Sequence, residues 1–172
     1  MNQTHIHLLL NHAPVMGTAF GALLLFYGLF KKSKSVIEAS MLAFIVTALC
    51  TIPVFLTGEP AEEAIENIPS IVKSSIETHE ENAEVAFWMM EALGIFSVLT
   101  FIMKVRENKM ADALTKSTLV FSLVVFGFMA KVGNEGGKIR HPEINNTTVN
   151  TEQPNKTQNN EQEKSGEEQH DD

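Results

Sequence analysis

The chain has 172 residues, of which 44% are hydrophobic, with a formal net charge of −8 and a mean hydropathy close to zero. The negative charge argues against a nucleic-acid-binding protein, because such a protein needs a basic face. The single cysteine, Cys50, lies inside an apolar segment, so neither an internal disulfide nor a thiolate metal cluster is possible. The mean hydropathy hides an uneven distribution, since residues 145–172 contain one aliphatic residue, Val149.

Most of the apolar residues fall in four segments. These are Ala13–Phe30, Val36–Leu56, Ala83–Met103 and Ala113–Ala130. As helices they would each cover roughly 27–32 Å, the thickness of the hydrocarbon core of a bilayer. They predict an all-α integral membrane four-helix bundle of up-down-up-down order within residues 1–144, and they exclude a soluble enzyme. The polar residues 145–172 carry seven acidic side chains and two lysines, and they predict a disordered acidic tail.

The basic residues predict how the bundle is oriented. Six of them lie in the two short connections 31–35 and 104–112, whereas residues 57–82 carry seven Glu and one Lys. The positive-inside rule therefore places the two basic turns inside, and the acidic segment and both termini outside. Residues 1–12 contain no Lys or Arg, unlike a cleaved signal peptide, so we expect the first segment to be retained as a membrane span.

The acidic segment 57–82 has a helical pattern of its own. Its apolar residues recur at helical spacing, and Pro69 is expected to divide it into two short helices, the second capped by Ser70. A short amphipathic helix of this kind would lie on the membrane surface or cover the outer mouth of the bundle.

Apart from His170 in the tail, all five histidines fall on the predicted outer side. They are His5, His7, His12, His79 and His141. Neutral imidazole is the commonest protein ligand of transition metals, so their convergence predicts a metal or haem site. The competing interpretation is that these side chains simply lie at the membrane interface, where one edge of the ring is apolar and the other is hydrated.

One candidate site is a single low-spin haem b. His12 and His79 are expected to face each other at similar depth and are the preferred axial ligands, with His141 and His7 as alternates. Small side chains follow His79 and His12 along the helices and could leave space for the macrocycle; they are Ala83, Ala86, Met90, Gly94, Gly17 and Gly21. Gly17 and Gly21 are also explained by close helix packing.

The other candidate is a non-haem iron, zinc or manganese ion. Several of the outer histidines would bind it, with Glu80 as an oxygen ligand. These candidate ligands are His7, His12, His79 and His141.

Carboxylates inside the apolar segments are a second signal. Glu91 lies about 12 Å into the third segment, and Glu84 is one heptad further out on the same face. An ionisable group at that depth is a candidate for a function such as proton transfer, unless it is protonated and hydrogen-bonded across the bundle. Glu38 and Lys116 each lie one turn from the inner surface, and we expect them to form an ion pair that fixes helix register.

Several short motifs resemble a family of bacterial four-span membrane proteins of unknown function. They are His7-Leu-Leu-Leu-Asn-His12-Ala-Pro14, Thr57-Gly-Glu-Pro-Ala-Glu62, His79-Glu80 and Gly136-Gly137-Lys-Ile-Arg-His141. The resemblance covers roughly residues 5–144. The chain departs from the family pattern where Pro is absent after His7, where Ala13 replaces an aromatic residue, and where Asn134 replaces a frequent His, which removes one candidate ligand.

The resemblance implies a location in the bacterial inner membrane and, because the family is grouped loosely with transmembrane b-type cytochromes, haem ligation by histidine. The leading hypothesis is an electron-transfer protein without catalytic activity of its own. It would be a small subunit of a larger respiratory or redox complex, and its partners would be other subunits and a quinone or periplasmic electron carrier. The alternatives are a cofactor-free accessory subunit and a metal-binding membrane protein.

Overall fold

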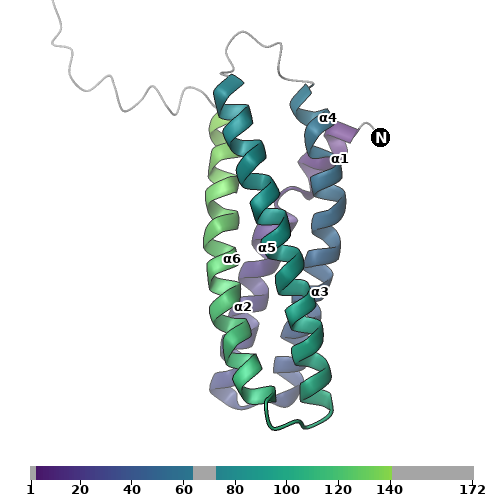
Figure 1. Cartoon of the computed structure of the whole chain (residues 1–172), viewed down its shortest axis with the longest axis vertical. Coiled ribbons are helices and arrows are strands. Elements are labelled where there is room, and N and C mark those ends of the chain that lie inside the picture. The colour runs from purple at the N-terminus through teal and green to yellow at the C-terminus, as the bar shows by residue number, and fades with distance from the viewer. Residues whose placement is uncertain (1–2, 64–72, 141–172) are drawn as a thin grey trace, which may run out of the picture.

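The computed structural model describes residues 3–63 and 73–140, and within them every regular element is a helix (Figure 1). The helices are α1 (Gln3–Leu10), α2 (Ala13–Lys31), α3 (Lys34–Leu56), α4 (Gly58–Glu63), α5 (Lys73–Val105) and α6 (Ala111–Arg140). Four of them, α2, α3, α5 and α6, are long and apolar enough to cross a membrane, as the sequence predicts.

The four long helices form an elongated bundle in which successive helices run in opposite directions (Figure 1). Both α2 and α5 pack against α3 and α6, which closes the ring of four helices. The short helices α1 and α4 pack against each other and against α3, at the end of the bundle where α5 begins and α6 finishes. Following the predicted orientation, we call this end the outer end.

The helices match the predicted spans unequally. Helices α2 and α3 coincide with the first two apolar segments within two residues, whereas α5 begins ten residues before Ala83 and α6 continues ten residues beyond Ala130. Hydropathy alone did not indicate these extensions because their exposed faces are polar. They nevertheless carry buried apolar residues such as Ile76, Val132 and Ile139.

Only part of the acidic segment 57–82 lies within the described residues. Its first part forms α4, but Pro69, Ser70 and the tail 145–172 lie outside the described residues. The residues from Lys73 onward belong to α5, so they are the start of the third long helix and not a separate short one.

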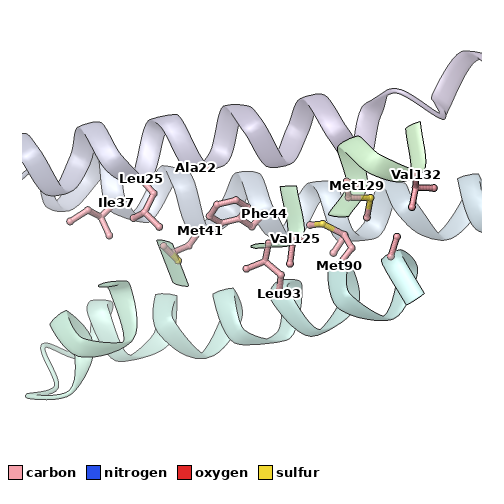
Figure 2. Packing of buried hydrophobic residues seen from close by; sticks show 12 residues of the cluster. Ala22, Leu25, Ile37, Met41, Phe44, Met90, Leu93, Val125, Met129 and Val132 are labelled. Carbon is pink, nitrogen blue, oxygen red and sulfur yellow. The ribbon is translucent and has the colours of Figure 1, made fainter. Parts of the chain in front are cut away.

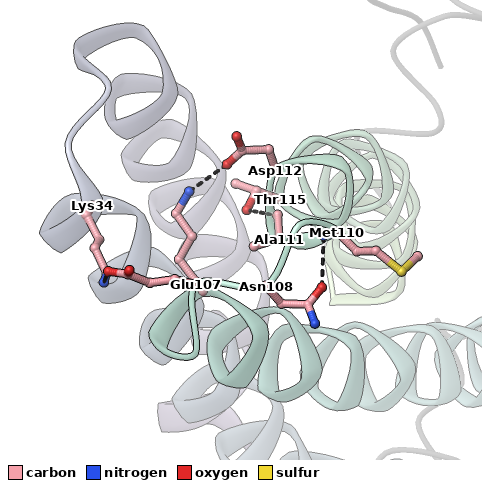
Figure 3. Close-up of polar contacts among 8 residues, drawn as sticks. Lys34, Glu107, Asn108, Met110, Ala111, Asp112 and Thr115 are labelled. Atoms are coloured by element: carbon pink, nitrogen blue, oxygen red, sulfur yellow. Dashed lines mark hydrogen bonds and ion pairs between the residues drawn. The ribbon is translucent and has the colours of Figure 1, made fainter.

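The two tight turns at the inner end are closed by backbone conformation and by ion pairs. Each contains a residue with positive φ, Lys32 at 53° and Glu107 at 52°. Lys34 Nζ lies 3.0 Å from Glu107 Oε1 and joins the turns, and Lys104 Nζ lies 2.7 Å from Asp112 Oδ1 (Figure 3). Both pairs lie at the exposed edge of the bundle, so each is expected to contribute little to the stability of the protein on its own.

The expected ion pair between Glu38 and Lys116 is not among those formed by the described residues. Lys116 is exposed. The lysines that form ion pairs at this end are nearer the turns: Lys34 binds Glu107, and Lys104 binds Asp112. Helix register at this end is therefore tied by residues in and beside the turns.

The core is made of large apolar side chains from all four long helices (Figure 2). Leu25, Met41, Phe44, Met90 and Val125 have no exposed surface. Buried threonines and serines lie among them and mostly donate to a backbone carbonyl one turn earlier in the same helix, which leaves few unpaired groups in the apolar interior.

Glycines allow the long helices to approach one another closely. A Cβ at Gly21 would come within 2.6 Å of Phe44 Cε1, and a Cβ at Gly94 within 2.6 Å of Ala48 Cβ. At Gly17 the added atom would collide with the side chain of Thr47. Small residues let membrane helices approach in this way, so these three glycines serve helix packing.

Candidate functional site

The structure brings two of the predicted histidines together at the outer end, His7 from α1 and His79 from α5. The two rings are close enough for the imidazole of His7 to affect the protonation of His79. Helix α4 contributes to the same region, because Gly58 faces the His7 ring, and a Cβ there would lie 3.7 Å from Cε1. Two parts of the chain that are 72 residues apart thus supply neighbouring imidazoles.

The ring of His7 is held by α3. Its Nδ1 lies 3.0 Å from the carbonyl oxygen of Val54, with the hydroxyl of Thr57 at 3.5 Å. A carbonyl oxygen only accepts hydrogen bonds, so Nδ1 carries the proton and donates it. Nε2 has no hydrogen-bond partner among the described residues.

His79 is half-buried between α5 and α6, and its Nδ1 is buried without a hydrogen-bond partner in the described part of the chain. The Cε1 edge of the ring lies against Gly136, where a Cβ would come within 3.1 Å of Cε1. The backbone of Val132, one turn earlier in α6, lies near enough to the ring to affect its protonation.

His79 lies four residues before Ala83, outside the apolar segment. Burial of the ring lowers its pKa; the Glu135 carboxylate opposes this change, the His7 imidazole adds to it, and the nearby Val132 backbone opposes it. Burial is the largest of these effects, so the neutral ring is favoured. A neutral imidazole is the form that binds a metal.

A polar cluster joins α5 to α6 beside His79; it consists of Asn82, Lys131 and Glu135. Asn82 Nδ2 donates to Glu135 Oε2 at 3.0 Å, and Lys131 Nζ donates to Asn82 Oδ1 at 3.2 Å. Lys131 Nζ also lies 3.6 Å from Glu135 Oε1, one turn along α6. These contacts fix the two helices relative to each other next to the ring of His79.

The other predicted histidines do not join this pair. His12 is exposed, and its Nδ1 is hydrogen-bonded to the side chain of its neighbour Asn11. His5 is also exposed, and His141 lies outside the described residues. The structure therefore pairs His79 with His7 where the sequence favoured His12. The break between α1 and α2 at residues 11–12 separates His12 from the inward-facing side of α1.

The groove expected to receive a haem macrocycle is filled by protein. Met90 is fully buried and accepts a hydrogen bond from Thr18 at 3.4 Å, so α2 and α5 are in direct contact there. The glycines expected to line its walls instead face side chains of α3. A macrocycle does not fit between these helices as they are packed here.

A multidentate ion site is not preassembled either. Among residues 3–63 and 73–140, no group of three or more His, Cys, Asp or Glu side chains is arranged to hold a metal ion. Glu80, the expected oxygen ligand, is exposed on α5. The donors that the structure does offer are the two imidazoles, with the Glu135 carboxylate nearby.

Of the two carboxylates in the third apolar segment, Glu84 is exposed and Glu91 is half-buried. Glu91 Oε1 is buried without a hydrogen-bond partner in the described part of the chain. The interpretation of Glu91 as an acid hydrogen-bonded across the bundle is therefore not supported.

The sequence did not single out the polar cluster or the backbone groups of Val54 and Val132. The extension of α6 beyond Ala130 carries Val132, Glu135 and Gly136. The apolar residues Val132 and Ile139, seven positions apart among polar residues, are the sequence signal that could have indicated it.

No family model, curated protein or solved structure gives a significant match to the chain.

Proposed function

We propose that the chain is a multi-pass membrane protein that binds a metal centre at its outer end through His7 and His79, and that this centre is haem b. The supporting observation is that imidazoles from two distant parts of the chain lie in the same region of the outer end. Nδ1 of His7 is held by the Val54 carbonyl, and Nδ1 of His79 is buried without a partner among the described residues. In metal-binding histidines a hydrogen bond at one ring nitrogen commonly fixes the tautomer and leaves the other nitrogen for the metal, and the Val54 carbonyl would act in this way on His7.

The number of donors favours haem over a free ion. A low-spin haem b needs two axial imidazoles, whereas a structural or catalytic ion site usually has three or four protein ligands. The bound haem would supply one-electron transfer. We therefore retain the electron-transfer role, as a small subunit of a larger inner-membrane redox complex that exchanges electrons with a quinone or an outer-side carrier.

This proposal differs from the sequence-based hypothesis in two respects. His7 replaces His12 as the partner of His79, because His12 is exposed. The macrocycle is assigned to the outer end, because the space between α2 and α5 is filled by Thr18 and Met90.

A second candidate is a non-haem iron, zinc or manganese ion bound by the same two imidazoles. The observation in its favour is the Glu135 carboxylate, which is close enough to His79 to act on its protonation and would add an oxygen donor. Mixed imidazole and carboxylate ligands suit these metals.

The test is a reduced-minus-oxidised visible spectrum of the detergent-purified full chain, with metal analysis of the same sample. Bound haem b with two histidine ligands gives a sharp absorption band at about 560 nm. The substitutions His7→Ala and His79→Ala should each abolish this band, whereas the matched controls His5→Ala and His12→Ala should retain it. Loss in His12→Ala with retention in His7→Ala would contradict the proposed ligand pair.

A colourless protein with stoichiometric metal would instead support the second candidate. A sample without colour or metal would reject both and would favour a cofactor-free accessory subunit.

A further inference from the structure

The inner end of the bundle is positively charged, although the chain as a whole is acidic. Its two turns and the helix ends beside them, residues 31–38 and 104–116, contain seven basic side chains and three carboxylates, so this end has a formal net charge of +4. The whole chain has −8. The ion pair of 3.0 Å between Lys34 Nζ and Glu107 Oε1 joins the two turns, so the basic residues of both turns belong to one surface (Figure 3).

The protein neutralises only part of this charge. Lys34 and Lys104 pair with Glu107 and Asp112, and the third carboxylate, Glu38, lies half-buried on α3. Four exposed basic side chains in or beside the turns make no ion pair or hydrogen bond with the described residues. We call them the basic rim; they are Lys31, Lys32, Arg106 and Lys109.

Exposed apolar side chains adjoin the basic rim. Phe30, Val105 and Met110 are 72%, 51% and 63% exposed, and each is the immediate sequence neighbour of a rim residue. Lys31 Nζ lies 5.6 Å from the centre of the Phe30 ring, so these two side chains lie together. A cation directly beside an exposed apolar side chain is placed where the headgroups of a bilayer meet the acyl chains.

We propose that the basic rim binds anionic phospholipids. The rim cations contact the phosphate oxygens of the headgroup, and the acyl chains lie along Phe30, Val105 and Met110. A lipid fits this surface better than a soluble phosphate does, because only a lipid also covers the exposed apolar side chains. The rim lies at the end of the bundle opposite His79, so this binding does not depend on the proposed metal centre.

The experiment measures lipid selectivity in the full chain reconstituted into phosphatidylcholine vesicles. Electron paramagnetic resonance compares the association of spin-labelled phosphatidylglycerol with that of spin-labelled phosphatidylcholine. The anionic lipid should be preferred by about 2- to 5-fold, since one Lys or Arg near an anionic headgroup contributes up to roughly fivefold. The preference should fall when salt is raised from about 0.1 M to about 1 M, because salt screens exposed charges.

Two double variants separate the rim from the ion pair between the turns. Lys32→Gln with Lys109→Gln removes two rim cations and should abolish most of the preference. Lys34→Gln with Glu107→Gln removes two charged side chains from the same turns without changing the net charge, so it should keep the preference. Glu107→Gln alone releases Lys34 from its partner and should increase the preference.

Three results would overturn the proposal. They are no preference for the anionic lipid in the unsubstituted protein, an equal loss in the two double variants, and a preference that persists at the higher salt concentration. The first would mean that the basic residues serve only to orient the chain. Glycerol phosphate, a soluble anion with the same phosphate group, should not displace the labelled lipid at millimolar concentrations; displacement would show a site for soluble phosphates in place of a lipid surface.

Discussion

Gly94 of α5 lies directly against the side chain of Ala48 on α3. A methyl group added at Gly94 would come within 2.6 Å of Ala48 Cβ, and neither group can turn away because each is attached directly to a helix backbone. The closest approach of these two long helices therefore depends on the absence of a side chain at one position.

Gly94→Ala is expected to destabilise the bundle. Overpacking a tight core costs about 1–3 kcal/mol, which outweighs the gain of up to about 1 kcal/mol from better helix propensity. The midpoint of denaturation by sodium dodecyl sulfate should fall. Gly127→Ala is the control, since an added Cβ there meets nothing within 4 Å, and its midpoint should stay or rise. Equal effects of the two substitutions would refute the packing role of Gly94.

Gly136→Ala is expected to displace His79 without unfolding the protein. The added Cβ would come within 3.1 Å of the ring, which is half-buried and can move away at the cost of its contacts with α6. Hemin affinity should fall by roughly an order of magnitude, as expected when a ligand loses its support. Gly137→Ala is the control, because a Cβ there meets nothing within 4 Å. Unchanged hemin affinity in Gly136→Ala would show that this contact does not support the ligand.

Glu91→Leu is expected to stabilise the bundle. Glu91 Oε1 is buried without a partner among the described residues, and an unsatisfied buried polar group costs about 1–3 kcal/mol. Leucine removes this cost within an apolar segment, so the denaturation midpoint should rise. Glu84→Leu should change it less, because Glu84 is exposed. A lower midpoint for Glu91→Leu would mean that the carboxyl group makes a stabilising contact.

The hydroxyl groups of Thr100 on α5 and Thr118 on α6 lie 3.1 Å apart in the buried core. Hydrogen bonds between membrane helices typically contribute about 0.6 kcal/mol and at most about 2 kcal/mol. A double-mutant cycle with Thr100→Val and Thr118→Val should give a coupling energy in this range. Both threonines also donate to carbonyls of their own helices, so a coupling energy of zero would show that the hydroxyls do not interact.

The sequence predicted the four long helices and their order, because each apolar segment is long enough to span a bilayer and signals a helix without reference to the rest of the chain. It also predicted that glycines of the first span bring helices together, which the contacts of Gly17 and Gly21 confirm, whereas Gly94, expected to line a groove for the macrocycle, packs against Ala48. It underestimated the lengths of α5 and α6, because the outer extensions of both helices have polar faces. Hydropathy does not detect a helical segment that is buried on one side only.

The pairing of histidines was decided by the tertiary structure. Counting positions along the chain placed His12 level with His79, but the helix breaks at residues 11–12. His7 of α1 is the histidine that binds α3 and lies near enough to His79 to affect its protonation. The register of α6 against α5 likewise places Val132, Glu135 and Gly136 around the ring of His79. A span can be recognised from the hydropathy of its own residues, whereas a site depends on the rotation and register of helices from distant parts of the sequence, which only their mutual packing determines.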